Sequence, residues 1–287
     1  MTASGEPAAN SPWWLSGTPL EAEHQRLMLR RRATIQWAQS TAPTLTDAER
    51  TRLGATWMRR SEAEYLAVST FSILAIDLVA AGAPADVLSL CLRAGIDEVR
   101  HAELCLRMAE LYTGERNLPP PGMSNLPDDP KRPRMEQALA NAILVSCVSE
   151  TYATTVLAAT REYTTDPVAL DVLTSIYSDE VMHARLGWSY LRYCLDKGGE
   201  KSIAAAAAMI PIAVRGVANV VEKPRPEGEI TAALRDHGLM TAREERLLFT
   251  CCVREVLAPG FSALGIPIGT VVDDYGDAWA NRVEAPT

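Results

Sequence analysis

The stretch NAILVSCVSETYATTVLAAT, residues 141–160, predicts a helix that is apolar on almost every side, yet it carries one carboxylate, Glu150, at its middle. At ~20 residues, the stretch is long enough to cross a membrane. An acid near the centre of such a span costs roughly 2.5–3.5 kcal/mol, so we interpret the helix as the middle of a protein core. A buried ionised carboxylate needs a partner, which must come from another segment of the chain.

Two other segments, DEVRHAELC at 97–105 and DEVMHARLG at 179–187, share the pattern Asp-Glu-Val-x-His-Ala. The glutamate and the histidine of each lie three positions apart, so on a helix they project from one face with Cβ atoms about 5–6 Å apart. That spacing suits two ligands of one metal ion. The spacing alone is weak evidence, because it also occurs at Glu21–His24, where it indicates a solvated helix face. The two candidate pairs are Glu98 with His101 and Glu180 with His183.

Each candidate pair follows a helix that carries its own isolated acid. Glu64 precedes Glu98, and Glu150 precedes Glu180, by about thirty residues, with a turn roughly midway in both cases. Two antiparallel helix pairs can therefore bring four glutamates and two histidines to one point. Four ionised glutamates in an apolar core repel one another, whereas two divalent cations make the cluster neutral. Carboxylate and imidazole ligands favour iron or manganese, and the sequence does not separate Fe/Fe from Mn/Fe or Mn/Mn.

Glu62 competes with Glu64 as the ligand from the first of these helices. Glu64 has Ala67, Val68 and Phe71 on its own side of the helix, at i+3, i+4 and i+7, which is the pattern of a core-facing stripe. Glu62 lies on a different face of the same helix. We therefore prefer Glu64 as the ligand and expect Glu62 at the surface.

Composition and charge favour a helical protein inside the cell. Hydrophobic residues make up 47% of the 287 residues and aromatic residues only 6%, with few alternating β-branched runs, so we predict an all-α fold. The formal net charge of -8 gives no attraction to nucleic acid or to anionic membrane surfaces. The six cysteines form no CxxC pair, which indicates a reducing compartment without disulfides or an attached zinc or rubredoxin-like centre. We expect a cytoplasmic location.

Capping residues, prolines and glycines divide the chain into predicted helices. The helices are expected over 20–40, 47–82, 85–113, 135–163, 167–198, 200–221 and 240–260, with proline-rich connections over 117–133 and 224–228. Pro211 is expected to break the 200–221 helix, and the last twenty or so residues are expected to be irregular. The predicted domains are a flexible tail over 1–18, a helical bundle with a preceding helix over 19–198, and a C-terminal helical extension packed on the bundle over 199–287.

Residues 50–198 resemble the ferritin-like di-iron carboxylate proteins, and within that group the uncharacterised bacterial ferritin-like domain proteins. The resemblance rests on EYLAVSTF, DEVRHAELC, VSET and DEVMHARL, with a weaker echo in DHGLMTAREERLL. It implies a ferritin-like four-helix bundle with an N-terminal helix and additional C-terminal helices. It also implies that the metal ligands, which would be the catalytic centre, are Glu64, Glu98, His101, Glu150, Glu180 and His183.

Three further residues are expected around these ligands. In the family, the acid before each Glu-x-x-His reaches across the site, so Asp97 would hold His183 and Asp179 would hold His101; the alternative is a helix-surface pair with a neighbouring arginine. Tyr177 could hydrogen-bond a ligand or carry a radical, although a buried tyrosine is more often part of the core.

Two other features leave alternatives open. Small residues one turn from the ligands, Gly187 among them, indicate either space for oxygen and substrate or close helix packing. A seventh ligand from His24 or His237 is not supported by spacing, and His237 is expected to cap or pack.

The function expected first is an O2-dependent oxidoreductase that hydroxylates, N-oxygenates, desaturates or oxidatively cleaves a small organic substrate. Its electrons would come from an external donor, a separate reductase, because no flavin, nicotinamide or iron-sulfur motif is visible. A ferroxidase or iron-storage role is the alternative, and a metal-free helical interaction protein is the second alternative. The expected partners are O2, the substrate, the reductase and a second copy in a homodimer, without nucleic acid or membrane.

Overall fold

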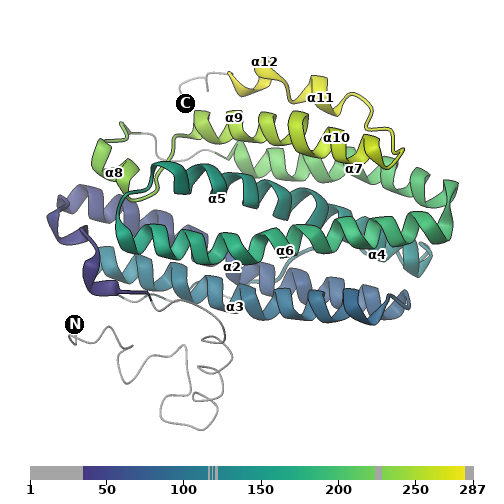
Figure 1. Cartoon of the computed structure of the whole chain (residues 1–287), viewed down its shortest axis with the longest axis horizontal. Helices are drawn as coiled ribbons and strands as arrows, with labels where there is room; N and C mark the ends of the chain where they lie inside the picture. The colour runs from purple at the N-terminus through teal and green to yellow at the C-terminus, as the bar shows by residue number, and fades with distance from the viewer. Residues whose placement is uncertain (1–34, 116, 118, 120–121, 224–227, 282–287) are drawn as a thin grey trace, which may run out of the picture.

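The computed structural model describes residues 35–115, 117, 119, 122–223 and 228–281, and these residues form helices and loops without a β-strand (Figure 1). The predicted all-α fold class is confirmed. Four long helical segments run side by side: α2 (Asp47–Ala80), α3 (Ala85–Thr113), a third segment over 134–163, and α6 (Pro167–Gly198). The third segment consists of α4 (Arg134–Ala142), the π-helix η3 (Ile143–Glu150) and α5 (Thr151–Tyr163).

Local sequence explains where these helices begin and end. Thr46 begins α2 with a capping box, because its hydroxyl accepts from Glu49 N and the Glu49 carboxylate accepts from Thr46 N. Gly114 ends α3 in the left-handed conformation at φ 74°, which glycine adopts without steric penalty. Asp166 caps α6 by accepting from the Ala169 amide, and Pro167 follows at the first helical position.

The four segments enclose two separate hydrophobic cores. One core lies toward the α2–α3 turn and includes Phe71, Leu74, Cys91, Ile143 and Tyr190. The other lies toward the opposite end and includes residues from the same helices, among them Leu53, Trp57, Met108 and Leu173. The positions between these two cores on α2, α3, η3 and α6 hold the predicted metal ligands, so the polar cluster lies at the middle of the helices.

Helices after α6 cover the third segment on its far side from α3 (Figure 1). α7 (Glu200–Val221) packs on η3 and α4, and α9 (Ala242–Cys252) packs on α5. The chain continues through a second π-helix, η4 (Val253–Leu257), into α10 (Ala258–Ala263), and α8 (Ala232–Asp236) lies near the start of α2. This arrangement covers one side of the apolar segment that carries Glu150.

Three predicted boundaries are wrong. α7 continues through Pro211, because packing against the third segment holds the helix together despite the lost backbone hydrogen bond. The last part of the chain contains two short helices, α11 (Val271–Asp274) and α12 (Asp277–Ala280); Tyr275 between them and Trp279 of α12 pack on Phe249. Residues 37–39 form a 3-10 turn, η1, instead of the end of an α-helix; the rest of that predicted helix and the tail over 1–18 lie outside the described residues.

Three helical segments are long and apolar enough to cross a membrane by length and composition: Asp47–Ala80, Arg134–Tyr163 and Glu200–Val221. The first two carry Glu64 and Glu150, respectively.

Candidate metal centre

Six side chains from four helical segments converge between the two hydrophobic cores. Five of them are buried, and the sixth, Glu64, has a side chain that is 21% exposed. The six are Glu64 from α2, Glu98 and His101 from α3, Glu150 from the end of η3, and Glu180 and His183 from α6. The structure therefore brings together the whole set of residues predicted as ligands.

The six side chains form two overlapping groups, in each of which the potential ligand atoms lie within 4.8 Å of one another. Glu64 and His101 belong to one group, and Glu150 and His183 belong to the other. Both groups contain Glu98 and Glu180. Two sites that share two carboxylates have the arrangement in which bridging acids hold a pair of adjacent cations.

Distances around the shared acids have the same two-fold pattern. The two oxygens of Glu180 lie 3.0 Å from His101 Nδ1 and 3.2 Å from His183 Nδ1. Those of Glu98 lie 3.5 Å from His101 Nδ1 and 3.0 Å from His183 Nδ1. Each shared carboxylate therefore presents one oxygen to each half of the site, and the two imidazole rings lie 5.7 Å apart between centroids.

Several polar atoms at the centre are buried without a hydrogen-bond partner among the described residues. They include both carboxylate oxygens of Glu98 and Nδ1 of His101. Leaving such atoms unsatisfied costs about 1–3 kcal/mol each, and more for a charged group. Cations between the two groups would satisfy these atoms, so the residues present fit a pair of bound metal ions.

The protonation of the metal-free cluster reflects its crowding. Burial, together with the charges of Glu98 and Glu180, raises the pKa of Glu64 to about 8. Burial and the nearby Glu180 also raise the pKa of Glu150 well above its usual value. Burial opposes ionisation of Glu180 too, but its close contacts with Glu150 and with both histidines hold the pKa of Glu180 well below the usual value. Without cations the cluster therefore keeps protons on some acids, which metal binding would displace.

Both histidines are buried against carboxylates that raise the pKa of their imidazole rings. Burial alone would lower the pKa of His101, but the carboxylates of Asp179 and Glu180 raise it well above the usual value. Burial would likewise lower the pKa of His183, but the carboxylates around it, Asp97 first among them, raise that pKa well above the usual value.

The acids that precede each Glu-x-x-His reach across the site. Asp179 Oδ2 lies 3.0 Å from His101 Nε2, and Asp97 Oδ2 lies 3.7 Å from His183 Nε2. Because Nε2 of each ring faces an acid, Nδ1 of each ring faces the centre. The arginine pairs are also present: Asp179 lies 3.2 Å from the buried Arg100, and Asp97 accepts from Arg93 on its own helix. Each aspartate can therefore face a histidine across the site and pair with an arginine at the same time.

Glu150 is positioned by a π-helix, and the periodicity of the sequence did not indicate this π-helix. The sequence predicted one regular helix over 135–163, whereas η3 is π-helical over Ile143–Glu150. π-helical segments inside α-helices occur frequently at functional sites. Gly187 on α6 is the sequence feature that relates to this π-helix, because a Cβ there would lie 2.5 Å from Ser146 Cβ and 2.7 Å from Cys147 N. Close helix packing therefore explains this glycine, rather than space for a substrate.

The remaining predicted residues have simpler surroundings. Glu62 is exposed on α2, as expected once Glu64 joins the cluster. Tyr177 is half-buried, and Cζ of Arg161 lies 4.5 Å from the centroid of the Tyr177 ring. The hydroxyl of Tyr177 makes no hydrogen bond to the six side chains. His237 bonds Tyr112 Oη and Thr41 Oγ1 far from the cluster, in a packing role. His24 lies outside the described residues.

One side of the centre is more open than the rest. α2 buries no residue between Ser61 and Phe71, and α5 is only half-buried over 152–159. Arg60 lies one turn before Glu64 on this side, over the Trp57 ring, and its Nη1 is buried without a partner among the described residues. No sequence pattern indicated this guanidinium, because only the packing of α2 reveals its burial.

No protein-family model matches this chain, and neither the curated proteins nor the solved structures contain a match.

Proposed function

We propose that the chain is a di-metal oxidoreductase, with two iron ions as its cofactor, that uses O2 to oxidise a small organic molecule. The observation that carries the proposal is the pair of shared acids, Glu98 and Glu180, each presenting its two oxygens to two separate histidines. The four-segment arrangement with this ligand set supports a ferritin-like four-helix bundle as the fold type.

The ligands would divide equally between the two ions. Glu64 and His101 would hold one ion, Glu150 and His183 would hold the other, and Glu98 and Glu180 would be shared. Four carboxylates against two divalent cations make the buried cluster neutral, which removes the repulsion that otherwise keeps protons on Glu64 and Glu150. Carboxylate and imidazole ligation fits iron, or manganese in one or both positions. Non-haem iron of this kind supplies the one-electron and oxygen chemistry that amino-acid side chains lack.

Asp97 and Asp179 would fix the histidine tautomers. When Nε2–H of a ring donates to its aspartate, the lone pair remains on Nδ1, which is the atom facing the cluster. Asp179 does this at hydrogen-bond distance and Asp97 at a longer distance, so we expect the Asp179–His101 interaction to be the stronger one.

Substrate would enter on the open side between α2 and α5. Glu64 is the only one of the six ligands with appreciable exposure, and residues 152–159 of α5 are only half-buried. Arg60 Nη1 and the Tyr163 hydroxyl, both buried without a hydrogen-bond partner among the described residues, would receive a polar or anionic group of the substrate. The cores on either side would keep water from the oxidised intermediates of the reaction.

We also propose that the protein is cytoplasmic and not embedded in a membrane. Two of its three long apolar helices carry acids of the buried cluster, and a carboxylate at the centre of a membrane span is unfavourable by roughly 2.5–3.5 kcal/mol.

Metal content tests the proposal. Iron-loaded wild-type protein should hold two ions per chain, whereas Glu64→Ala and Glu150→Ala should each lower the stoichiometry. Glu62→Ala is the matched control, because it removes an exposed acid two positions from Glu64 on the same helix. Unchanged metal content in Glu150→Ala would contradict the assignment.

Oxygen consumption then separates the proposed activity from iron handling. Uptake by the reduced protein that is stimulated by small aromatic or aliphatic carboxylates supports an oxygenase. Uptake proportional only to added Fe(II), together with a large hollow assembly on size-exclusion chromatography, would support the ferroxidase alternative instead.

A further inference from the structure

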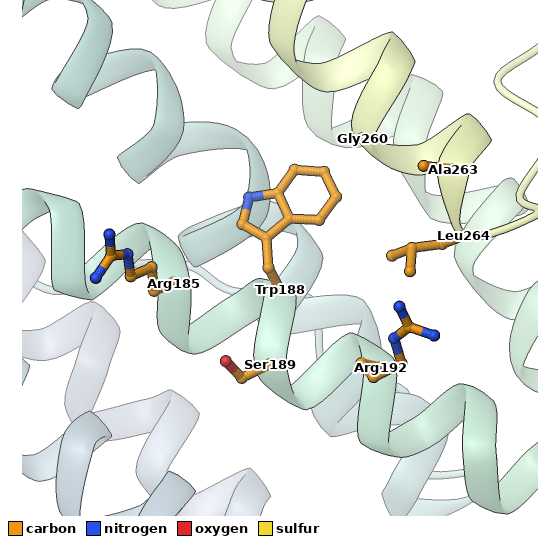
Figure 2. Close-up of a pocket in the computed structure, with 7 residues that line it drawn as sticks. All are labelled: Arg185, Trp188, Ser189, Arg192, Gly260, Ala263 and Leu264. Atoms are coloured by element: carbon orange, nitrogen blue, oxygen red, sulfur yellow. The ribbon is translucent and has the colours of Figure 1, made fainter.

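A surface groove lies between α6 and α10, on a different part of the molecule from the open side described above. It has a volume of about 590 Å³ and is lined by Arg185, Trp188, Ser189, Arg192, Gly260, Ala263 and Leu264 (Figure 2). Trp188 lies between the two arginines along α6, and its ring extends toward α10. Gly260 permits this approach, because a Cβ there would lie 2.9 Å from the Trp188 ring.

The groove concentrates positive charge on an acidic protein. Arg185 and Arg192 lie seven positions apart, on one face of α6, and neither forms an ion pair with a described residue. The guanidinium of Arg185 donates to the sulfur of Met182 at 3.8 Å and makes no other hydrogen bond to a described residue. The chain has a formal net charge of -8, so an uncompensated arginine pair is a local exception that would attract a negatively charged partner.

Trp188 connects this groove with the metal centre. Its indole N–H donates to Thr151 Oγ1 at 3.2 Å, and Thr151 directly follows Glu150 in the chain. The indole also packs on Phe261, with ring centroids 4.6 Å apart. One aromatic side chain thus extends from the charged groove to the residue next to a proposed metal ligand.

We propose that this groove is the docking site of an acidic electron-donor protein and that Trp188 lies on the path of the electrons. The inference rests on the proposed di-iron function, which needs an external source of electrons. Two single-electron transfers would take place: each oxidises the one-electron centre of the donor and reduces one ferric ion of the pair to ferrous. No atom is transferred, and the arginines act by binding the acidic face of the donor.

Binding tests the docking surface without requiring turnover. The probe is a plant-type [2Fe-2S] ferredoxin, an acidic one-electron protein, titrated against the full-length protein at low and high ionic strength. Wild-type protein should bind more weakly as salt increases, and Arg185→Glu with Arg192→Glu should weaken binding by roughly tenfold or more at low salt. The control is Arg134→Glu with Arg215→Glu, which makes the same charge change at exposed arginines outside the groove.

The docking proposal is overturned if ferredoxin does not bind, if binding is independent of salt, or if both double variants lose affinity equally. It is also overturned if the groove variant binds ferredoxin normally but loses affinity for benzoate, because the groove would then hold a small anion.

Reduction kinetics test the path. Ferredoxin, kept reduced by its NADPH-dependent reductase, should reduce the iron-loaded Trp188→Leu protein several-fold more slowly than wild type, whereas dithionite with methyl viologen should reduce both at the same rate. Equal rates with ferredoxin would remove Trp188 from the path. Failure of the proposed function is distinguishable, because it would appear as wild-type protein without bound iron; absence of docking in iron-loaded protein refutes only the groove.

Discussion

Replacing Gly187 by alanine tests whether close packing of α6 against the π-helix positions the metal ligands. The new Cβ would lie 2.5 Å from Ser146 Cβ, 2.7 Å from Cys147 N and 2.9 Å from Cys147 Sγ. Ordinary contacts between such atoms are about 3.5–4.0 Å, so α6 and η3 must separate by about 1 Å. One of the contacted atoms belongs to the backbone, so a side-chain rotation cannot relieve the overlap.

The expected effect is on stability and on metal binding together. Overpacking of this kind destabilises a protein by roughly 1–3 kcal/mol. The displacement also moves His183, one turn before Gly187, away from Glu150 at the end of η3. We therefore expect Gly187→Ala to unfold at lower denaturant concentration and to bind fewer than two metal ions.

Gly95→Ala is the matched control, a second helical glycine beside the same site. Its nearest contact would be Phe71 Cβ at 3.7 Å, an ordinary packing distance, so the substitution should stabilise α3 by up to about 1 kcal/mol through helix propensity. Urea titration followed by circular dichroism gives the free energy of unfolding, and inductively coupled plasma mass spectrometry gives the metal content. The reasoning is refuted if Gly187→Ala equals Gly95→Ala in both measurements.

Three further predictions follow from other contacts. Asp179→Asn should lower metal affinity by about 10–100-fold, because the amide no longer enforces the tautomer of His101. Asp97→Asn should lower it less, because Asp97 lies farther from His183, and Asp171→Asn, at an exposed position of α6, should leave it unchanged. Competition with a chromogenic chelator measures the three affinities. Burial lowers the pKa of His237 below its usual value of about 6.5, so the unfolded chain binds this proton at higher pH than the folded protein does, and stability falls as pH drops below about 6.5. His237→Asn should therefore lose less unfolding free energy than wild type between pH 7.5 and 5.5, and an equal loss in both proteins would contradict this assignment. Arg60→Met should raise the KM for carboxylate substrates more than it lowers kcat while leaving metal content unchanged; equal KM values would remove Arg60 from the substrate site.

The sequence predicted those features that depend on local chemistry. The capping box at Thr46, the proline after Asp166 and the left-handed Gly114 set helix boundaries within the chain itself, so their positions could be read directly. The preference for Glu64 over Glu62 followed from helical periodicity, which decides the face of a residue before any tertiary contact is known. Convergence of the six ligands followed from the repeated spacing of acids and histidines.

The features that escaped prediction depend on packing between distant segments. A π-helix over Ile143–Glu150 leaves the apolar pattern of residues almost unchanged, and its partner Gly187 lies on another helix. Pro211 looked like a helix end because the proline itself is unfavourable there, whereas neighbouring helices hold α7 together. The groove around Trp188 is formed by residues from α6 and α10, which no local pattern connects.

Anomalous X-ray diffraction at the iron edge, from crystals of the iron-loaded protein, tests the central proposal most directly. We expect two peaks about 3.5–4 Å apart. One should lie near His101 Nδ1, the other near His183 Nδ1, and both within bonding distance of Glu98 and Glu180. A single peak, or peaks bound elsewhere with these side chains unliganded, would contradict the account.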